Sequence, residues 1–174
     1  MTRDLTRLSR PLSFLLRHRP DAAGLVLDPA GWTAVGPVLV ALGCDRATLE
    51  QLVREDAKQR YALEADRIRA QQGHSVAVDL GLSPQRPPEV LWHGTAERSL
   101  PAVLQQGLLP RKRTHVHLSP DPATARQVGA RHGRPAVLRV DAAAAWRAGR
   151  VFLLTGNGVW LTSAVPPAFL QVQR

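Results

Sequence analysis

The segment Ser83-Pro84-Gln85-Arg86-Pro87-Pro88 divides this chain of 174 residues into two parts. Its three prolines cannot continue a helix or the centre of a sheet, because proline lacks an amide hydrogen and its ring fixes the backbone. We therefore expect a linker over residues 83–89, between a first domain over residues 1–82 and a second over residues 90–174. The chain is long enough for a substantial hydrophobic core.

The charge of the chain changes at the same boundary. The formal net charge is +9, and residues 1–85 hold 11 Lys and Arg against 10 Asp and Glu. Residues 86–174 hold 12 Lys and Arg against only 4 Asp and Glu. A basic second half favours a polyanionic partner, such as nucleic acid or a phosphate-rich ligand. Arginine supplies 21 of the 23 cations, which favours bidentate phosphate binding only weakly.

The composition excludes several other classes of protein. No apolar run is long enough to span a bilayer, and the polar start Met1-Thr2-Arg3-Asp4 lacks the pattern of a signal peptide. The single Cys44 cannot form an intramolecular disulfide or a cysteine-based zinc site. The glycine patterns of Rossmann and P-loop proteins are missing. We expect a cytoplasmic monomer that makes no membrane contact and holds no metal.

The first half has the pattern of three helices and a small hairpin. Leucines spaced three and four apart between Leu5 and Leu16 predict an amphipathic helix that ends near Arg19-Pro20. Further helices are expected over residues 35–42 and 47–56, a short strand at 32–33, and hairpin strands at 61–63 and 68–70. This arrangement indicates a winged-helix lobe that faces nucleic acid, although such a fold alone does not establish the function.

The second half alternates strands with short helices, so the expected fold class is α+β. Strands are expected over residues 90–95, 114–119, 136–140, 151–154 and 158–162. Helices are expected over residues 100–106, 122–129 and 142–148. Gly107 is suited to end the first of these helices, and Val165-Pro166-Pro167 is expected to close the domain.

Two histidines alternate with apolar residues in Thr114-His115-Val116-His117-Leu118-Ser119, directly after Arg111-Lys112-Arg113. Side chains two apart in a strand share a face, so His115 and His117 should lie together, opposite the two apolar side chains. Two imidazoles beside three cations make a poor metal site and a suitable site for a highly charged anion. A basic loop that leads into an edge strand is the plainer alternative.

Six short motifs occur together and in a fixed order. They are Leu15-Leu16-Arg17-His18, Lys58-Gln59-Arg60-Tyr61, Arg69-Ala70-Gln71-Gln72-Gly73-His74-Ser75, His93-Gly94-Thr95, Arg113-Thr114-His115-Val116-His117-Leu118-Ser119 and Asn157-Gly158-Val159-Trp160-Leu161-Thr162. In these motifs the chain resembles the NAD-dependent RNA 2′-phosphotransferases, the tRNA 2′-phosphotransferase family, from about Leu8 to Leu170. The resemblance implies an N-terminal winged-helix lobe and a C-terminal ADP-ribosyltransferase-like lobe of mixed β structure.

The resemblance also implies a two-step reaction that consumes NAD+ as co-substrate. An internal 2′-phosphate of a tRNA-like RNA, such as tRNA splicing leaves, attacks the ribose carbon that bears nicotinamide. The ADP-ribosylated RNA phosphate that results is then attacked at phosphorus by the adjacent ribose hydroxyl. The products are RNA with a free 2′-hydroxyl, ADP-ribose 1″,2″-cyclic phosphate and nicotinamide.

Residue roles carry over from the resemblance motif by motif. The implied catalytic residues are Arg17, His18, Arg60 and Arg113. The implied cofactor-binding residues are His93, Gly94, Thr95, Ser119 and Asn157. The residues expected to bind or orient the substrate are His115, His117, Arg69, Gln72 and His74. Guanidinium groups suit this chemistry, because they stay charged and bind phosphate oxygens in a fork.

Acidic residues are scarce in the second half: after Glu97 only Asp121 and Asp141 occur, and both are placed to cap a helix or turn. Related enzymes that ADP-ribosylate proteins typically use a glutamate to activate the acceptor. A phosphate acceptor is already an anion, so it needs no carboxylate and would be repelled by one. Two alternatives stay open: an ADP-ribosyltransferase acting on a terminal nucleic-acid phosphate or a protein, and a non-enzymatic winged-helix protein that binds nucleic acid.

Overall fold

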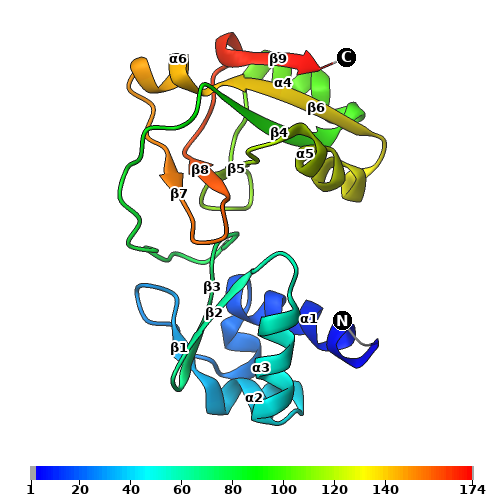
Figure 1. Cartoon of the computed structure of the whole chain (residues 1–174), viewed down its shortest axis with the longest axis vertical. Coiled ribbons are helices and arrows are strands. Elements are labelled where there is room, and N and C mark those ends of the chain that lie inside the picture. The colour runs from blue at the N-terminus through cyan, green and yellow to red at the C-terminus, as the bar shows by residue number, and fades with distance from the viewer. Residues whose placement is uncertain (1–2, 174) are drawn as a thin grey trace. The chain divides into compact units, whose positions relative to one another are not determined.

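The computed structural model describes residues 3–173 and divides the chain into two compact units, Met1–Gly81 and Leu82–Arg174 (Figure 1). Helices and small antiparallel sheets make up both units, so the fold class is α+β, as the sequence predicts. Within the described residues, no helix combines the length and the apolar character that a membrane span requires.

Within the residues that the structure describes, the first unit contains three α-helices, one short 3-10 helix and three strands. In chain order these are α1 (Arg3–Arg17), η1 (Pro20–Ala23), β1 (Thr33–Ala34), α2 (Val35–Leu42), α3 (Arg46–Glu55), β2 (Tyr61–Glu64) and β3 (Arg67–Ala70). The strands form one antiparallel sheet in the order β1-β3-β2. Figure 1 shows the helices packed together beside the β2–β3 hairpin.

The local sequence explains where these helices begin and end. Gly43 adopts a left-handed conformation, with φ of 61°, and ends α2. The carboxylate of Asp45 then accepts a hydrogen bond of 2.8 Å from the backbone N–H of Thr48 and caps α3. Leucines of α1 and α3 form the core of the unit with apolar residues of the sheet, among them Ile68. This core fixes the end of α1, where the Arg-His motif lies.

The second unit consists of two three-stranded antiparallel sheets with short helices around them. Its elements are β4 (Val90–Ala96), η2 (Glu97–Ser99), α4 (Leu100–Gln106), β5 (Val116–Leu118), α5 (Pro122–Gly129), η3 (Ala130–His132), β6 (Pro135–Asp141), α6 (Ala142–Arg147), β7 (Leu153–Leu154), β8 (Trp160–Thr162), η4 (Pro167–Phe169) and β9 (Leu170–Gln173). The strand orders are β4-β6-β9 and β5-β8-β7. Two backbone hydrogen bonds between Trp92 and Ser119, of 2.9 and 2.7 Å, connect the two sheets.

Both late aspartates cap helices. The carboxylate of Asp121 accepts from the backbone N–H of Thr124 at 2.8 Å at the start of α5. The carboxylate of Asp141 accepts from the backbone N–H of Ala144 at 2.9 Å at the start of α6. The capping role that the sequence predicts for them is therefore confirmed, and both carboxylates are engaged with helix backbone.

Several expectations for the second unit were wrong in detail. Strand β9 follows the Val165-Pro166-Pro167 segment that was expected to close the domain, and it pairs with β6. Its four residues alternate between apolar and polar side chains, but the strand is short and mostly exposed, and its partner strand lies far away in the chain. Three strands are shorter than expected. β7 is limited to Leu153–Leu154, β8 begins at Trp160, and β5 begins at Val116, so His115 lies in the turn before it.

Helix α5 packs directly on strand β4 through two glycines (Figure 1). A Cβ atom added to Gly94 would overlap the carbonyl oxygen of Ala125 in α5. A Cβ atom added to Gly129 would in turn press on the backbone of Thr95. Only glycine allows backbones to approach this closely. The sequence associates Gly94 with cofactor binding. In the structure, the packing of helix α5 against β4 is enough to require glycine at this position.

Candidate active site

The end of α1 is joined to the Arg69–Ser75 motif by several hydrogen bonds. The backbone carbonyl of Arg17 accepts from the N–H groups of Ser75, at 2.9 Å, and Val76, at 3.4 Å. Nδ1 of His18 lies 2.9 Å from the hydroxyl oxygen of Ser75. The side chain of Arg17 is buried, 9% exposed, and Gly73 lies against its guanidinium. Two of the motifs identified in the sequence therefore form one cluster in the first unit.

His74 is enclosed within this cluster, since only 1% of its surface is exposed. Burial, and to a smaller extent the positive charges of Arg17, His18 and Arg69, lower the pKa of His74 to about 4. Its Nε2 is buried and forms no hydrogen bond within the described residues. A neutral, enclosed imidazole is suited to hold neighbouring side chains in place. For His74 this favours the predicted orienting role over direct binding of the substrate.

The burial of His74 predicts a pH-dependent stability. The unfolded pKa of about 6.5 lies above the folded value of about 4, so the unfolded chain binds the proton more readily. Above pH 6.5, His74 is neutral in both states and does not change the free energy of unfolding. As the pH falls from 6.5 toward 4, proton binding to the unfolded chain lowers the free energy of unfolding by about 3 kcal/mol. Urea unfolding at pH 7 and pH 4.5 should show a smaller loss in His74→Gln than in the unchanged protein. Equal losses in the two proteins would contradict the assignment.

Arg60 forms an ion pair with Asp56, which is only 3% exposed. Its Nη2 lies 2.6 Å from one carboxylate oxygen of Asp56 and 2.8 Å from the hydroxyl of Ser9, and its Nε contacts the same carboxylate. Burial alone would raise the pKa of Asp56, but the hydrogen bonds from Arg60 outweigh burial and lower it. The predicted catalytic Arg60 therefore also has a structural partner that the sequence did not reveal.

This ion pair changes the expected result of replacing Arg60. Arg60→Ala would leave the buried carboxylate of Asp56 unpaired, so we expect a loss of about 3 kcal/mol in the free energy of unfolding. Urea denaturation of Arg60→Ala, Asp56→Ala and the double variant measures the coupling between the two side chains. Additive losses would mean that the two side chains do not stabilise each other and would contradict the expected coupling.

Arg69 packs on an aromatic ring beside the same cluster. Its guanidinium carbon lies 4.6 Å from the centre of the Trp32 ring, and Nη1 donates to the carbonyl of Ala30 at 3.2 Å. Such a cation–π contact fixes the direction of the side chain. Gln72 is half-buried in the next segment of the chain. The structure thus gathers Arg17, His18, Arg69 and His74 in one unit, with Gln72 on the connecting segment.

In the second unit, His93 is held by the strand that carries His117. Nδ1 of His93 lies 2.9 Å from the carbonyl oxygen of His117. Because a carbonyl can only accept, Nδ1 carries the hydrogen and Nε2 of the neutral ring is an acceptor. Burial lowers the pKa of His93, the hydrogen bond to His117 opposes this, and the positive charges of Arg113 and His132 lower the pKa further. His93 is therefore neutral near pH 7.

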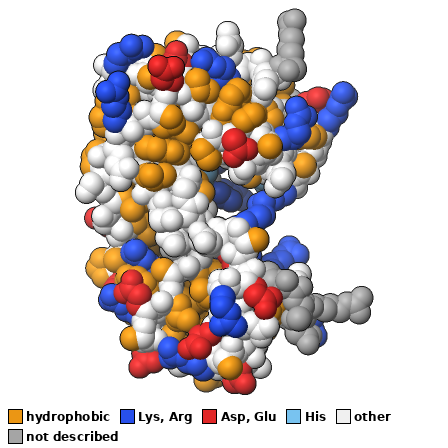
Figure 2. Space-filling model, viewed as in Figure 1, with side chains coloured by type: hydrophobic (Ala, Val, Ile, Leu, Met, Phe, Trp, Pro, Cys, Tyr) orange, Lys and Arg blue, Asp and Glu red, His pale blue; other side chains and the backbone are white. Residues whose placement is uncertain are grey.

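Cations gather around this imidazole. The side chain of Arg113 is exposed, yet surrounding protein atoms desolvate its guanidinium enough to lower its pKa, and the positive charge of Arg131 lowers it further. Figure 2 shows Lys and Arg side chains over the α5 side of this unit, which carries the exposed Arg126 and Arg131, whereas Nε of the neighbouring Arg134 lies 3.1 Å from a carboxylate oxygen of Glu97. Repulsion among like charges is relieved by an anion, so this region is suited to bind phosphate.

Other residues predicted for the site make mainly local contacts. Nδ1 of His115 lies 3.0 Å from the hydroxyl of Thr114, and burial lowers the pKa of His115. The carboxamide oxygen of Asn157 accepts from the hydroxyl of Thr155 at 2.7 Å, in the turn between β7 and β8. Thr95 is half-buried on β4, two residues from His93. Hydrogen bonds join His93, His117 and Ser119 with strands β4 and β5. His115 and Asn157 are bonded to neighbours in their own turns.

Sequence reasoning missed four residues around these clusters: Ser9, Asp56, Arg131 and His132. Asp56 lies four residues before Arg60, which is a spacing typical of ion pairs and was an available signal. Arg131 and His132 follow α5 as two consecutive cations in a half with few acidic residues. Ser9 lies 51 residues from Arg60 in the chain, and nothing local indicates that contact.

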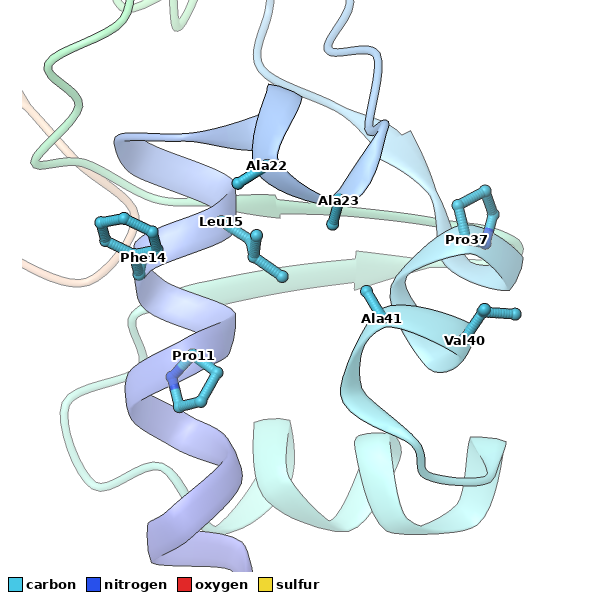
Figure 3. Close-up of a pocket in the computed structure, with 8 residues that line it drawn as sticks. All are labelled: Pro11, Phe14, Leu15, Ala22, Ala23, Pro37, Val40 and Ala41. Atoms are coloured by element: carbon cyan, nitrogen blue, oxygen red, sulfur yellow. The ribbon is translucent and has the colours of Figure 1, made fainter.

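A hollow of about 550 Å³ opens on the first unit between α1, η1 and α2 (Figure 3). The residues that line it are Pro11, Phe14, Leu15, Ala22, Ala23, Pro37, Val40 and Ala41. None of these side chains can donate or accept a proton, so the hollow itself is not suited to catalysis. Within the described residues, no cluster of histidine, cysteine and carboxylate side chains is suited to hold a metal ion.

The fold is α+β, and each unit carries a cluster of arginine and histidine side chains. These features are typical of a protein that binds phosphate groups through its own cations. The family model described as RNA 2′-phosphotransferase, Tpt1/KptA family, matches residues 3–164. The chain belongs to this family and is a transferase. The resemblance found in the sequence is thereby confirmed.

Similar proteins match the chain over nearly its whole length. A probable RNA 2′-phosphotransferase of Herpetosiphon aurantiacus is 48% identical over 99% of this chain and 98% of its own. One from Trichormus variabilis is 49% identical, over 97% of this chain and 96% of its own. One from Streptomyces griseus is 50% identical, again over 97% and 96%.

Proposed function

We propose that this protein removes an internal 2′-phosphate from RNA and consumes NAD+ as co-substrate. The phosphate is first ADP-ribosylated and is then released as ADP-ribose 1″,2″-cyclic phosphate, with nicotinamide and 2′-hydroxyl RNA as the other products. A tRNA-like RNA is the proposed substrate class, as in tRNA splicing. The first unit is proposed as a winged-helix lobe that faces the RNA, and the second as an ADP-ribosyltransferase-like lobe that binds NAD+.

The observation that carries this proposal is the set of positive charges around His93: every charge that shifts the pKa of His93 or of Arg113 is a cation. Arg113 and His132 both depress the pKa of His93, and Arg131 depresses that of Arg113. The two aspartates of the unit that follow Glu97 are occupied as helix caps. An acceptor that brings its own negative charge, such as a 2′-phosphate, suits this environment better than a neutral protein side chain.

One feature of the second unit suits NAD+, namely a hydrogen-bond acceptor on the ring of His93. His93 holds its Nδ1–H on the carbonyl of His117, so its Nε2 can accept a hydrogen bond from a ribose hydroxyl. His93, Gly94, Thr95, Ser119 and Asn157 are the residues proposed to hold the co-substrate. When bound, NAD+ supplies an electrophilic ribose carbon with nicotinamide as its leaving group.

The first unit supplies the other proposed catalytic residues. Arg17 and Arg60 can neutralise phosphate oxygens through their guanidinium groups, and His18 can exchange a proton during the second step. Arg113 adds a cation from the second unit. Arg69, Gln72, His74, His115 and His117 are proposed to bind or orient the substrate.

The experiment is an assay of an oligonucleotide with one internal 2′-phosphate, incubated with and without NAD+ and analysed by mass spectrometry. We expect 2′-hydroxyl RNA, ADP-ribose cyclic phosphate and nicotinamide in equal amounts, and no reaction without NAD+. Release of inorganic phosphate without NAD+ would refute the proposal and indicate a phosphatase. A stable ADP-ribosylated terminal phosphate would instead support the alternative transferase activity, and binding without turnover would favour a non-enzymatic protein. The cytoplasmic location and monomeric state stay predictions.

A further inference from the structure

The imidazole of His18 is held on two sides within the first unit. Its ring centroid lies 6.3 Å from that of Phe14, one helical turn earlier in α1, with an angle of 49° between the rings. Phe14 lies at the end of α1 beside the apolar hollow (Figure 3). Nδ1 of His18 lies 2.9 Å from the hydroxyl of Ser75. The aromatic contact restricts the rotation of the His18 ring, and the hydroxyl of Ser75 determines whether Nδ1 donates or accepts a hydrogen bond.

Ser75 is itself fixed in place by the end of α1. Its backbone N–H donates to the carbonyl of Arg17 at 2.9 Å, and its hydroxyl lies 3.5 Å from the same oxygen. The adjacent His74 is buried and anchors the segment. The backbone of Ser75 is therefore fixed to the end of α1, and its side chain adopts the rotamer in which the hydroxyl faces both the Arg17 carbonyl and Nδ1 of His18.

The hydroxyl of Ser75 has one hydrogen to donate and lone pairs with which to accept. If it donates to the carbonyl of Arg17, its oxygen accepts from Nδ1–H of His18. This arrangement suits both charge states of the imidazole, because Nδ1 carries a hydrogen in the neutral Nδ1–H form and in the cation. Neither the serine nor the ring needs to turn when a proton arrives at Nε2 or leaves it.

We propose that Ser75 is a positioning residue for catalysis, which holds His18 as its Nδ1–H tautomer and confines proton exchange to Nε2. This inference rests on the proposed function, in which His18 exchanges a proton in the second step. In that step the attacking ribose hydroxyl loses its proton to Nε2 while its oxygen bonds to phosphorus, and the RNA 2′-oxygen leaves. The proton on Nε2 is then available to that departing oxygen, so the step balances without another reactant.

The first test measures the tautomer and needs no turnover. Nitrogen NMR of ¹⁵N-histidine-labelled full-length protein separates protonated from unprotonated ring nitrogens, and His18→Gln identifies the His18 signals. We expect neutral His18 to show a protonated Nδ1 and an unprotonated Nε2. In Ser75→Ala we expect a mixture of both tautomers. A predominant Nε2–H form or a mixture in the unchanged protein would overturn the proposal.

The second test separates positioning from binding. Ser75→Ala should lower kcat roughly 10- to 100-fold, because a misplaced proton-exchanging group costs rate, with little change in KM for RNA or NAD+. Ser75→Thr keeps the hydroxyl and should restore most of kcat, and Ser83→Ala, an exposed serine of the proline-rich segment, serves as the matched control. Wild-type kcat in Ser75→Ala, or a change confined to KM, contradicts the inference. If the unchanged protein itself has no NAD+-dependent activity, the proposed function fails instead, and the NMR result still decides the tautomer.

Discussion

Replacement of Arg113 by alanine is expected to lower kcat about 100- to 1,000-fold, the cost of removing one charged group that stabilises a transition state. The side chain is exposed and packs into no core cluster. Its backbone N–H, which donates to the carbonyl of Pro110 at 3.1 Å, is unaffected by the substitution. The fold of the second unit should therefore survive, so that the loss reports on chemistry. Single-turnover kinetics with the 2′-phosphorylated oligonucleotide, together with circular dichroism, measure both quantities.

Arg150→Ala is the matched control for this substitution, because it removes another exposed arginine of the second unit, from the segment after helix α6. It lowers the net charge equally, and Arg150 is not among the charges that shift the pKa of His93 or of Arg113. Arg113→Lys adds a finer comparison, since it keeps the charge and loses the planar fork of donors. Should Arg113→Ala retain near wild-type kcat, or should Arg150→Ala lose as much, a specific role for Arg113 would be refuted.

Replacement of Gly94 by alanine is expected to destabilise the second unit by about 4 kcal/mol or more, at the upper end of point-mutation effects. The added methyl group would meet the carbonyl oxygen of Ala125, and neither β4 nor α5 can yield without separating the two elements. Backbone obstruction of this kind is harder to relieve than overpacking of flexible side chains. Urea unfolding monitored by tryptophan fluorescence should show a lost or strongly shifted transition.

Gly36→Ala is the appropriate control for this second substitution. Gly36 lies in helix α2, and a Cβ atom there would meet nothing within 4 Å. Alanine is the better helix former by about 0.8–1.0 kcal/mol, whereas Pro37 disfavours the helical conformation of a preceding residue that carries a Cβ atom. The two effects oppose each other, so the stability of this variant should stay within about 1 kcal/mol of that of the unchanged protein. A folded, fully stable Gly94→Ala protein would show that α5 does not pack on β4 as described.

Most helices and strands could be predicted because their signals are local. Leucine spacing in α1, the glycine after α2 and the caps Asp45, Asp121 and Asp141 all act within a few residues of one another. Long-range pairing offers no such signal. Strand β9 is stable only because β6 accepts it as a neighbour, and the shortness of β7 depends equally on its partner strand.

The site could be predicted as a set of residue types but not as a set of contacts. Motif matching named Arg17, His18 and Arg60, yet it did not reveal that Asp56 holds Arg60 or that Ser75 meets His18. The glycine in His93-Gly94-Thr95 invites an interpretation as a ligand-binding residue, although the helix above it already requires glycine. One residue type can serve either role, and only three-dimensional packing distinguishes them.

Strand β9 has a consequence for the behaviour of the protein in concentrated solution. β6 is central in its sheet because β4 pairs with one edge and β9 with the other. A chain ended at residue 164, where the family match stops, would lose β9 and leave one row of β6 amide and carbonyl groups open. An open strand edge is a template for pairing between molecules. The last strand thus replaces a largely buried edge of seven residues with a mostly exposed edge of four, and we expect it to reduce pairing between molecules.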